Sequence, residues 1–272
     1  MEYVLSTSHG KDSMACIYVI LEVLHWPLDR IVHAEVWATD DTPADPPEMV
    51  EWKRRAEETI FRRWGYRVEH VRGKWTFESR FYDPLSTKAK KEFVGRTRGW
   101  PLGVKGSWCQ RDLKTVALGS GKDVVQYIGI AADEPERFGQ LGEKKRSPLV
   151  EAGWTEEMCL NWCRENGLLS PIYDGCARGG CWFCPKQPLE QLRKLRKQHP
   201  QYWDLMLKWD KDSPVTFKAG KIDKKTGILK PGKTVHEYDE RFRMEDEHLL
   251  IPGDTKFKWN MLKDDMLNYR WF

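Results

Sequence analysis

The sequence of 272 residues lacks any long hydrophobic run, any internal repeat and any low-complexity segment. Its mean hydropathy is −0.68. No stretch approaches the roughly 18 consecutive apolar residues of a membrane span. The first residues, MEYVLSTSHG, also lack the basic and apolar regions of a secretory signal. We therefore expect a cytoplasmic protein without a membrane segment.

Cysteine is sparse and odd in number, with seven in the chain. Together with the absent export signal, this argues against a disulfide framework and favours metal or redox chemistry. The formal net charge is +4, which is too small to indicate nucleic-acid binding by itself. Only local clusters of basic residues could indicate nucleic-acid binding.

Short apolar runs alternate with helical patterns over the first half of the chain. The expected strands cover residues 3–5, 31–38, 67–71 and 124–131, and the expected helices cover 14–24, 47–64 and 109–117. This alternation predicts a parallel twisted sheet with helices on both faces.

We expect three parts: an α/β nucleotide-binding domain over 1–150, a helix with a cysteine-rich segment over 151–187, and a basic and aromatic appendage over 188–272. Later helices are expected at 155–166, 189–198 and 202–209, with a hairpin around 224–227. The basic stretch 73–107 is either a flap over a site or a surface insertion.

The segment SHGKDS at residues 8–13 lies between the first expected strand and the first expected helix. Backbone amides and the helix dipole favour an anion at such a junction. The glycine allows close approach, the serines and lysine add donors and charge, and Asp12 either orients the loop or binds magnesium. A structural Gly/Ser turn is the alternative. The expected phosphate-binding residues are Ser8, His9, Gly10, Lys11, Asp12 and Ser13.

This S-x-G-K-D-S pattern resembles the signature of the PP-loop ATP pyrophosphatases, in the form seen in the phosphoadenosine-phosphosulfate (PAPS) reductase family. Three other segments are similar to that family over most of residues 1–187. Residues 38–42 (ATDDT) resemble its D-T-G region, 107–114 (SWCQRDLK) its W-C-T-x-x-L-K segment, and 129–137 (GIAADEPER) its G-x-R-x-x-E-S-x-R segment. Pro43 replaces the glycine of the D-T-G region.

The resemblance implies an adenine nucleotide alpha hydrolase-like fold that binds ATP and Mg²⁺. It adds three residues to the expected nucleotide contacts, namely Asp40, Gly129 and Arg137. The residues expected to be catalytic are Lys11, Asp12, Ser13 and Asp133.

Three cysteines lie within nine residues, in the pattern Cys176-x4-Cys181-x2-Cys184-Pro. A Cys-x2-Cys turn brings two sulfurs onto one ion, so the pattern predicts a metal site rather than three free buried thiols. The Cys-Pro ending and the resemblance favour a [4Fe-4S] cluster over a structural Zn²⁺ ion.

The fourth ligand of this site has three candidates, namely Cys109, Cys159 and Cys163. Cys159 and Cys163 are neighbours on one helix face, which is also typical of core residues. The resemblance to the phosphorothioation sulfurtransferases, whose W-C cysteine joins a distal cysteine cluster, favours Cys109.

The resemblance predicts an adenylating enzyme that cleaves ATP between the α- and β-phosphates and activates an acceptor for sulfur transfer. A sulfonucleotide (APS or PAPS) reductase is the alternative. Its nucleophile lies in an E-C-G-[IL]-H motif near the C-terminus, and no cysteine follows Cys184 here. A non-catalytic nucleotide-binding subunit is the third interpretation.

Basic residues favour a nucleic-acid acceptor, either DNA or tRNA. They occur in the runs Lys144-Lys145-Arg146 and Arg193-Lys194-Leu-Arg196-Lys197, with Trp203 and Trp209 following. A sulfur-donor protein such as a cysteine desulfurase is the other expected partner.

Overall fold

The computed structural model describes residues 1–86, 91, 94–101, 107–119, 121, 123–173, 179–222, 229–230 and 232–249. The chain forms two compact units. Unit 1 comprises Met1–Arg80 and Gly106–Cys184, and unit 2 comprises Phe81–Lys105 and Pro185–Phe272. The units therefore divide at different places from the expected boundaries after residues 150 and 187.

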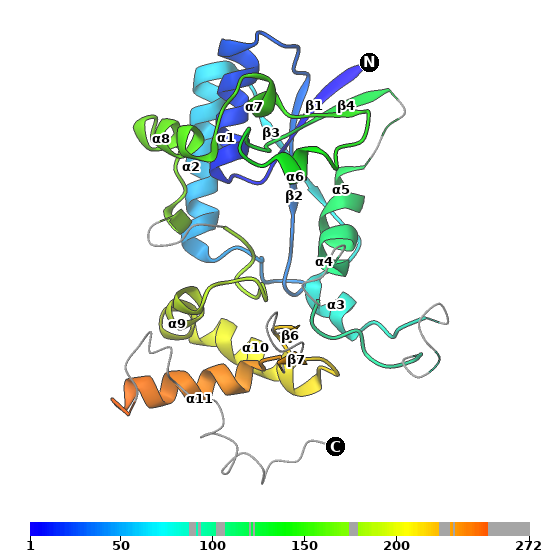
Figure 1. Ribbon diagram of the computed structural model, residues 1–272, viewed down its shortest axis with the longest axis vertical. Coiled ribbons are helices and arrows are strands. Elements are labelled where there is room, and N and C mark those ends of the chain that lie inside the picture. The colour runs from blue at the N-terminus through cyan, green and yellow to red at the C-terminus, as the bar shows by residue number, and fades with distance from the viewer. Residues whose placement is uncertain are drawn as a thin grey trace. The chain divides into compact units, whose positions relative to one another are not determined.

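The sheet of unit 1 has five parallel strands in the order β3-β2-β1-β4-β5 (Figure 1). Their bounds are β1 (Glu2–Thr7), β2 (Arg30–Glu35), β3 (Val68–Arg72), β4 (Val124–Ile128) and β5 (Lys145–Arg146). The central strand β1 pairs with β2 along one edge and with β4 along the other. The predicted parallel α/β sheet is confirmed.

Helices connect these strands, and α1 packs against α7 and α8 while the η3 and α5 turns pack against β2. The bounds are α1 (Lys11–Tyr18), η1 (Val19–Val23), α2 (Pro47–Trp64), α3 (Phe77–Tyr82), α4 (Trp108–Gln110), η3 (Arg111–Thr115), α5 (Val116–Leu118), α6 (Pro135–Phe138), α7 (Pro148–Glu151), α8 (Glu156–Glu165) and η4 (Pro171–Tyr173). Figure 1 shows α1, α2 and α8 on one side of the strands and α4 and α5 on the other.

Helix α2 has clear signals at both ends. Pro47 occupies its first turn, where a missing N–H costs nothing, and Gly65 ends it in the left-handed conformation with φ of 77°. Its buried residues recur at helical spacing, so one face of the helix packs into the core of unit 1. They are Met49, Trp52, Lys53, Ala56 and Ile60.

Unit 2 contains the helices α9 (Leu189–Gln198), α10 (Pro200–Asp212) and α11 (Val235–Asp246), and the antiparallel pair β6 (Lys221–Ile222) and β7 (Leu229–Lys230). The buried carboxylate of Asp210 accepts hydrogen bonds from the Trp100 indole at 3.0 Å and from the Val235 amide at 2.9 Å. It therefore fastens the first turn of α11 to α10. Among the helices that the structure describes, none is long and apolar enough to cross a bilayer.

Candidate nucleotide and thiol site

A cavity of about 530 Å³ opens in unit 1 at the carboxyl ends of the strands. It lies where the strand order reverses, because the chain leaves β1 toward β2 and later returns to β4 on the other side of β1. Open α/β sheets bind ligands at such switch points. The lining comes from residues of β1, β2 and β4, from the loop at 8–13, and from the segment that begins at Gly179.

The loop between β1 and α1 is held together by the hydroxyl of Ser13. This hydroxyl donates to the Gly10 carbonyl at 3.0 Å and accepts from the Ser8 amide at 3.2 Å. Ser8, Gly10, Asp12 and Ser13 all line the cavity. The loop therefore has the fixed, donor-rich geometry that suits an anion at a helix N-terminus.

Gly129, at the end of β4, packs directly against this loop. A Cβ atom at Gly129 would lie 2.8 Å from the Ser13 amide nitrogen and 2.9 Å from the Asp12 carbonyl carbon. Both are backbone atoms of α1, so they cannot move aside cheaply. The glycine thus allows the closest approach of β4 to the start of α1, and it also lines the cavity.

The side chain of Lys11 takes a different direction from the one that the sequence suggests. Its Nζ atom lies 2.7 Å from Asp12 Oδ1 and 2.9 Å from Glu156 Oε1 on α8, and Lys11 is not among the residues that line the cavity. Burial opposes its charge, but the two carboxylates outweigh burial and raise the pKa of Lys11. Lys11 therefore stays protonated, and its ion pair with Glu156 connects the loop to α8.

Asp12 does line the cavity. Burial raises the pKa of Asp12, and the carboxylates of Glu156 and Glu134 raise it further, while Lys11 opposes this. A cation that approached Asp12 from the cavity would favour the ionised carboxylate, which is the form that magnesium binds.

The other predicted residues are distributed unevenly. Arg137 lines the cavity and pairs with Glu134 at 2.6 Å. Asp133 is exposed and accepts from the Glu156 amide at 3.0 Å, so it supports the start of α8. Asp40 has a fully exposed side chain, 4.0 Å from Arg72. Neither aspartate is part of the lining.

Sequence reasoning missed a polar group on the β2 side of the cavity. Lys53 lies 2.5 Å from Asp45 Oδ2 and 3.2 Å from His33 Nε2, and all three residues line the cavity. Burial lowers the pKa of His33 to about 2, with Lys53 adding to the effect. No motif marks these residues, because β2 and α2 bring them together from positions 20 apart.

Lys114 is another cation on the lining, and the sequence indicated it only as part of a family segment. It is open to the cavity, and Cys181 raises the pKa of Lys114 more than any other group does. Among the described residues its ammonium forms no hydrogen bond or ion pair. Lys114 is therefore available to an anion in the cavity.

The cysteine segment is anchored by the two aromatic residues between Cys181 and Cys184. The Trp182 indole donates to the Pro43 carbonyl at 2.9 Å. The Phe183 ring lies 4.1 Å from that of Phe77, which in turn stacks on Trp108 at 5.2 Å. Because Trp108 precedes Cys109, this aromatic row brings Cys109 into the neighbourhood of the segment.

Three of the four predicted ligands influence one another electrostatically, namely Cys109, Cys181 and Cys184. Burial raises the pKa of the Cys181 thiol to about 12, and Cys181 lines the cavity. Within the described part of the chain, no three His, Cys, Asp or Glu side chains are placed to hold a metal. The remaining predicted ligand, Cys176, lies outside the described residues.

The alternative ligands belong to a different group of thiols. Cys159 and Cys163 are buried in the core with Cys16, and neither of them lines the cavity. The Cys163 thiol donates to the Lys11 carbonyl at 3.3 Å. Both α8 cysteines therefore pack in the core of unit 1, where α8 lies against α1.

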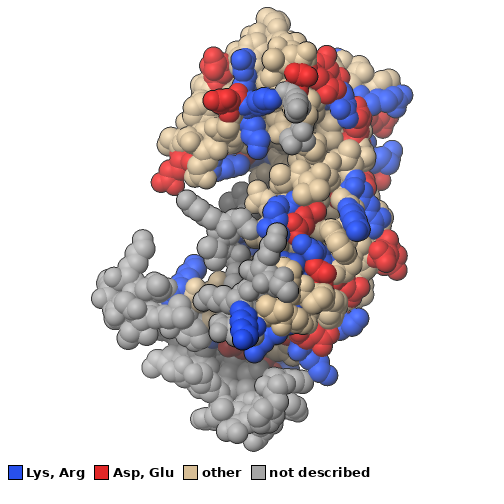
Figure 2. Space-filling view, turned by 90° about the vertical axis from the view of Figure 1, so that its right-hand side faces the viewer, with Lys and Arg blue, Asp and Glu red and all other residues tan. Residues whose placement is uncertain are grey.

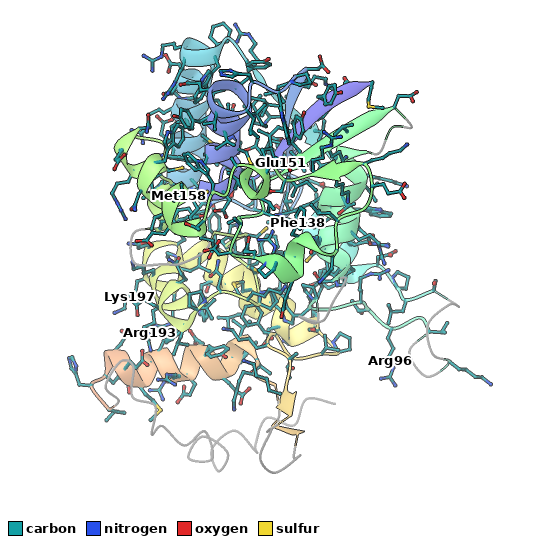
Figure 3. All side chains as sticks on the ribbon, turned by 45° about the horizontal axis from the view of Figure 1, so that its top comes forward. Arg96, Phe138, Glu151, Met158, Arg193 and Lys197 are labelled. Carbon is teal, nitrogen blue, oxygen red and sulfur yellow. The ribbon has the colours of Figure 1, made fainter. Side chains whose placement is uncertain are left out.

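The basic face of α9 is compensated within unit 2. Arg193 lies 2.5 Å from Glu245, and Arg196 lies 2.8 Å from Asp239 and 2.5 Å from Asp246 (Figure 3 labels Arg193). These carboxylates all come from α11. The guanidinium groups of Arg193 and Arg196 are thus engaged inside the unit.

Comparison with models of known protein families gives no match for this chain, and comparison with curated proteins gives none.

Proposed function

We propose that the protein is an ATP-dependent adenylating enzyme that activates an acceptor for sulfur transfer. One observation carries the proposal: the phosphate-binding loop and Cys181 line the same cavity at the switch point of the sheet. A loop suited to anions beside a thiol would serve adenylation followed by sulfur transfer. The resemblance of SHGKDS to the PP-loop signature supports the same reaction.

In the proposed first step, an acceptor oxygen attacks the α-phosphorus of ATP. A bond forms between this oxygen and phosphorus, the bond between the α-phosphorus and its bridging oxygen breaks, and pyrophosphate leaves with the bond's electron pair. The loop amides and the Ser8 hydroxyl hold the leaving phosphates, and Lys114 offers a positive charge that is already in place. Magnesium bound with ATP would neutralise further charge, with Asp12 as its protein ligand.

The acceptor is proposed to be a nucleic acid, either DNA or tRNA. The support now comes from the cavity rather than from α9, because Lys114 and Lys145 both line it. Among the described residues, neither ammonium has a carboxylate partner. A sulfur nucleophile supplied by a donor protein would then displace AMP from the acceptor.

An iron–sulfur cluster remains part of the proposal, although the described residues do not by themselves complete a metal site. Its support is the mutual influence of Cys109, Cys181 and Cys184. We derive no step of the reaction from it. Anaerobic protein should be brown, with absorption near about 400 nm from thiolate-to-iron charge transfer. Cys181→Ser should remove colour and iron, whereas the matched variant Cys16→Ser should retain both. A colourless protein with one tightly bound zinc per chain would contradict the cluster.

The deciding experiment follows pyrophosphate release from ATP by anaerobic protein, with and without DNA or tRNA. Asp12→Asn should abolish acceptor-dependent release while the protein stays folded, because Asp12 is the carboxylate of the loop. Glu51→Gln, on the exposed face of α2, is the control and should leave release unchanged. In parallel, the protein receives PAPS, thioredoxin and reductant. Sulfite formation at a catalytic rate would replace the proposal with the reductase alternative.

A further inference from the structure

The second residue of the phosphate loop, His9, has an unusual conformation. Its φ angle is 57°, in the left-handed region that residues with a Cβ atom adopt rarely. Glycine would take this conformation without strain. The chain instead has a histidine there, and the imidazole is completely buried. A buried side chain at a strained position indicates that the side chain itself has a role.

The imidazole of His9 reaches helix α2. Its Nε2 atom lies 2.8 Å from Glu57 Oε1, a contact without hydrogen-bond geometry, and neither atom has a hydrogen-bond partner elsewhere among the described residues. The ring also packs edge-on against His33, with centroids 4.6 Å apart, and edge-on against Trp52, with centroids 6.4 Å apart. His9 therefore connects the loop with both β2 and α2.

Glu57 is itself held in place from its other side. His70 on β3 lies 3.0 Å from Glu57 Oε2, and the second ring nitrogen of His70 lies 2.7 Å from Glu35 Oε1. Glu57 is thus fixed between two imidazoles. A side chain with so little freedom is a firm attachment point for the loop.

The backbone of His9 belongs to the hydrogen-bond network of the loop. Its amide donates to the Thr7 hydroxyl at 3.1 Å, and that hydroxyl donates to Ser13 Oγ at 3.3 Å. The peptide planes on both sides of His9 turn with its φ and ψ angles. The directions of the neighbouring loop amides therefore depend on where the His9 side chain is held.

We infer that His9 and Glu57 form a positioning pair that holds the phosphate loop in its anion-binding conformation. The inference rests on the proposed function, because it assigns the loop to the phosphates of a nucleotide. His9 is a positioning residue in this role, and it acts through the loop amides. Without the attachment to α2, the loop would leave the strained conformation and its amides would diverge.

A double-mutant cycle tests the pair, with dissociation constants for ATP and for inorganic pyrophosphate measured by calorimetry. His9→Gly and Glu57→Ala should each weaken the binding of both anions about tenfold. The double variant should also lose about tenfold in affinity rather than a hundredfold, because each substitution removes the same attachment. Glu51→Ala is the control on the same helix. The partners of Glu51 are the exposed Arg54 and Arg55. The affinity of the Glu51→Ala variant for both anions should equal that of the wild type.

A purely structural effect would give a different pattern. His9→Gly relieves the backbone strain but empties the space of a buried imidazole, so its affinities are compared well below its thermal midpoint, where the variant is folded. In turnover, KM for ATP should rise and kcat should stay within about twofold, since the pair supports ground-state and transition-state binding alike.

Losses that multiply to a hundredfold, unchanged affinity in either single variant, or an equal loss in Glu51→Ala would overturn the inference. Its failure is separable from that of the proposed function. A wild-type protein that binds pyrophosphate but never produces pyrophosphate from ATP would refute the proposed function. The double-mutant cycle would then still test the His9–Glu57 pair. A wild type that binds neither anion would overturn both.

Discussion

Two lysines of unit 1 differ in whether their ammonium groups are paired with carboxylates. Lys11 stands in the phosphate loop, yet its ammonium pairs with Asp12 and Glu156. Lys114 stands about a hundred residues later and is open to the cavity. The loop motif specifies a lysine at its position, but the direction of that side chain depends on where α8 places Glu156. A single sequence does not contain that information.

This difference gives the first prediction. Lys11→Met should lower the free energy of unfolding by about 1–3 kcal/mol, because it leaves a partly buried carboxylate without its partner. Lys114→Met should change stability little and should weaken ATP binding about tenfold or more, because it removes a positive charge from the cavity in which we propose that ATP binds. Urea unfolding and calorimetry measure the two quantities. Equal effects of the two substitutions on ATP binding would contradict the assignment.

His70 provides a prediction about pH. Burial works against its charge, but Glu57 and Glu35 prevail and raise the pKa of His70 above 6.5. The stability that His70 contributes is therefore complete below pH 6.5 and is lost as the pH rises through the folded-state pKa. Burial raises the pKa of Glu57, but His9 and His70 outweigh burial and lower this pKa below 4.5, so the contribution of Glu57 is lost only in stronger acid.

The wild type should therefore exceed His70→Asn in stability most clearly between pH 4.5 and 6.5. Urea unfolding across this range, with NMR titration of the His70 ring, measures the effect. The outcome would be contradicted by a stability difference that grows toward pH 8.

At the scale of elements, the sequence predicts best where end signals are strong. Helix α2 spans the expected residues, because Pro47 and Gly65 mark its ends. The bounds of α9 also agree, since Pro188 precedes it. By contrast, β5 has two exposed residues, too few for any alternation to be visible. The helix α11 was not expected, although Thr234 and Glu237 form a capping box at its start.

The site was predictable in part for the same reason. A strand–loop–helix junction is a local pattern, so the position of the loop between β1 and α1 could be predicted from contiguous residues. The Lys53, Asp45 and His33 group depends on how α2 lies against β2, and no local pattern reports that. The cysteine spacing indicated nearby thiols, and the aromatic row from Trp108 to Phe183 explains how Cys109 approaches them.

The close contact between β4 and α1 gives a prediction at this scale. Gly129→Ala places a methyl group 2.8 Å from the Ser13 amide nitrogen, so the start of α1 has to move. We expect a loss of about 1–3 kcal/mol in unfolding free energy, as for other overpacked sites, together with weaker ATP binding. Gly142→Ala is the matched control, because its Cβ would meet no atom within 4 Å. Equal behaviour of the two variants would refute the contact's importance.

At the scale of the whole molecule, positive and negative side chains are interspersed on the face that Figure 2 shows. The net charge of +4 therefore does not form one basic surface there. On α9, the sequence alone shows the cations of a run such as Arg193 to Lys197. The carboxylates that pair with them come from α11, some fifty residues later.

Arg196→Ala is the test of this charge distribution. The substitution removes ion pairs to Asp239 and Asp246, so unit 2 should lose about 1 kcal/mol of stability. Binding of tRNA or DNA should remain within about twofold of the wild type, since the guanidinium is already engaged. Lys145→Ala, on the lining of the cavity, should weaken binding instead. Filter binding at fixed salt measures both, and a larger loss in Arg196→Ala would contradict this view.

The pairing of β1 has a consequence for folding of the chain during its synthesis on the ribosome. Glu2 pairs with Val124, so one edge of the central strand stays unpaired until a partner 122 residues later has been synthesised. At about 5–20 residues per second, this delay lasts roughly 6–24 s. The segment that interrupts unit 1, Phe81–Lys105, emerges during this interval, before the rest of its own unit. The nascent chain therefore exposes an unpaired apolar strand edge for many seconds, which makes early chaperone contact at residues 2–7 advantageous.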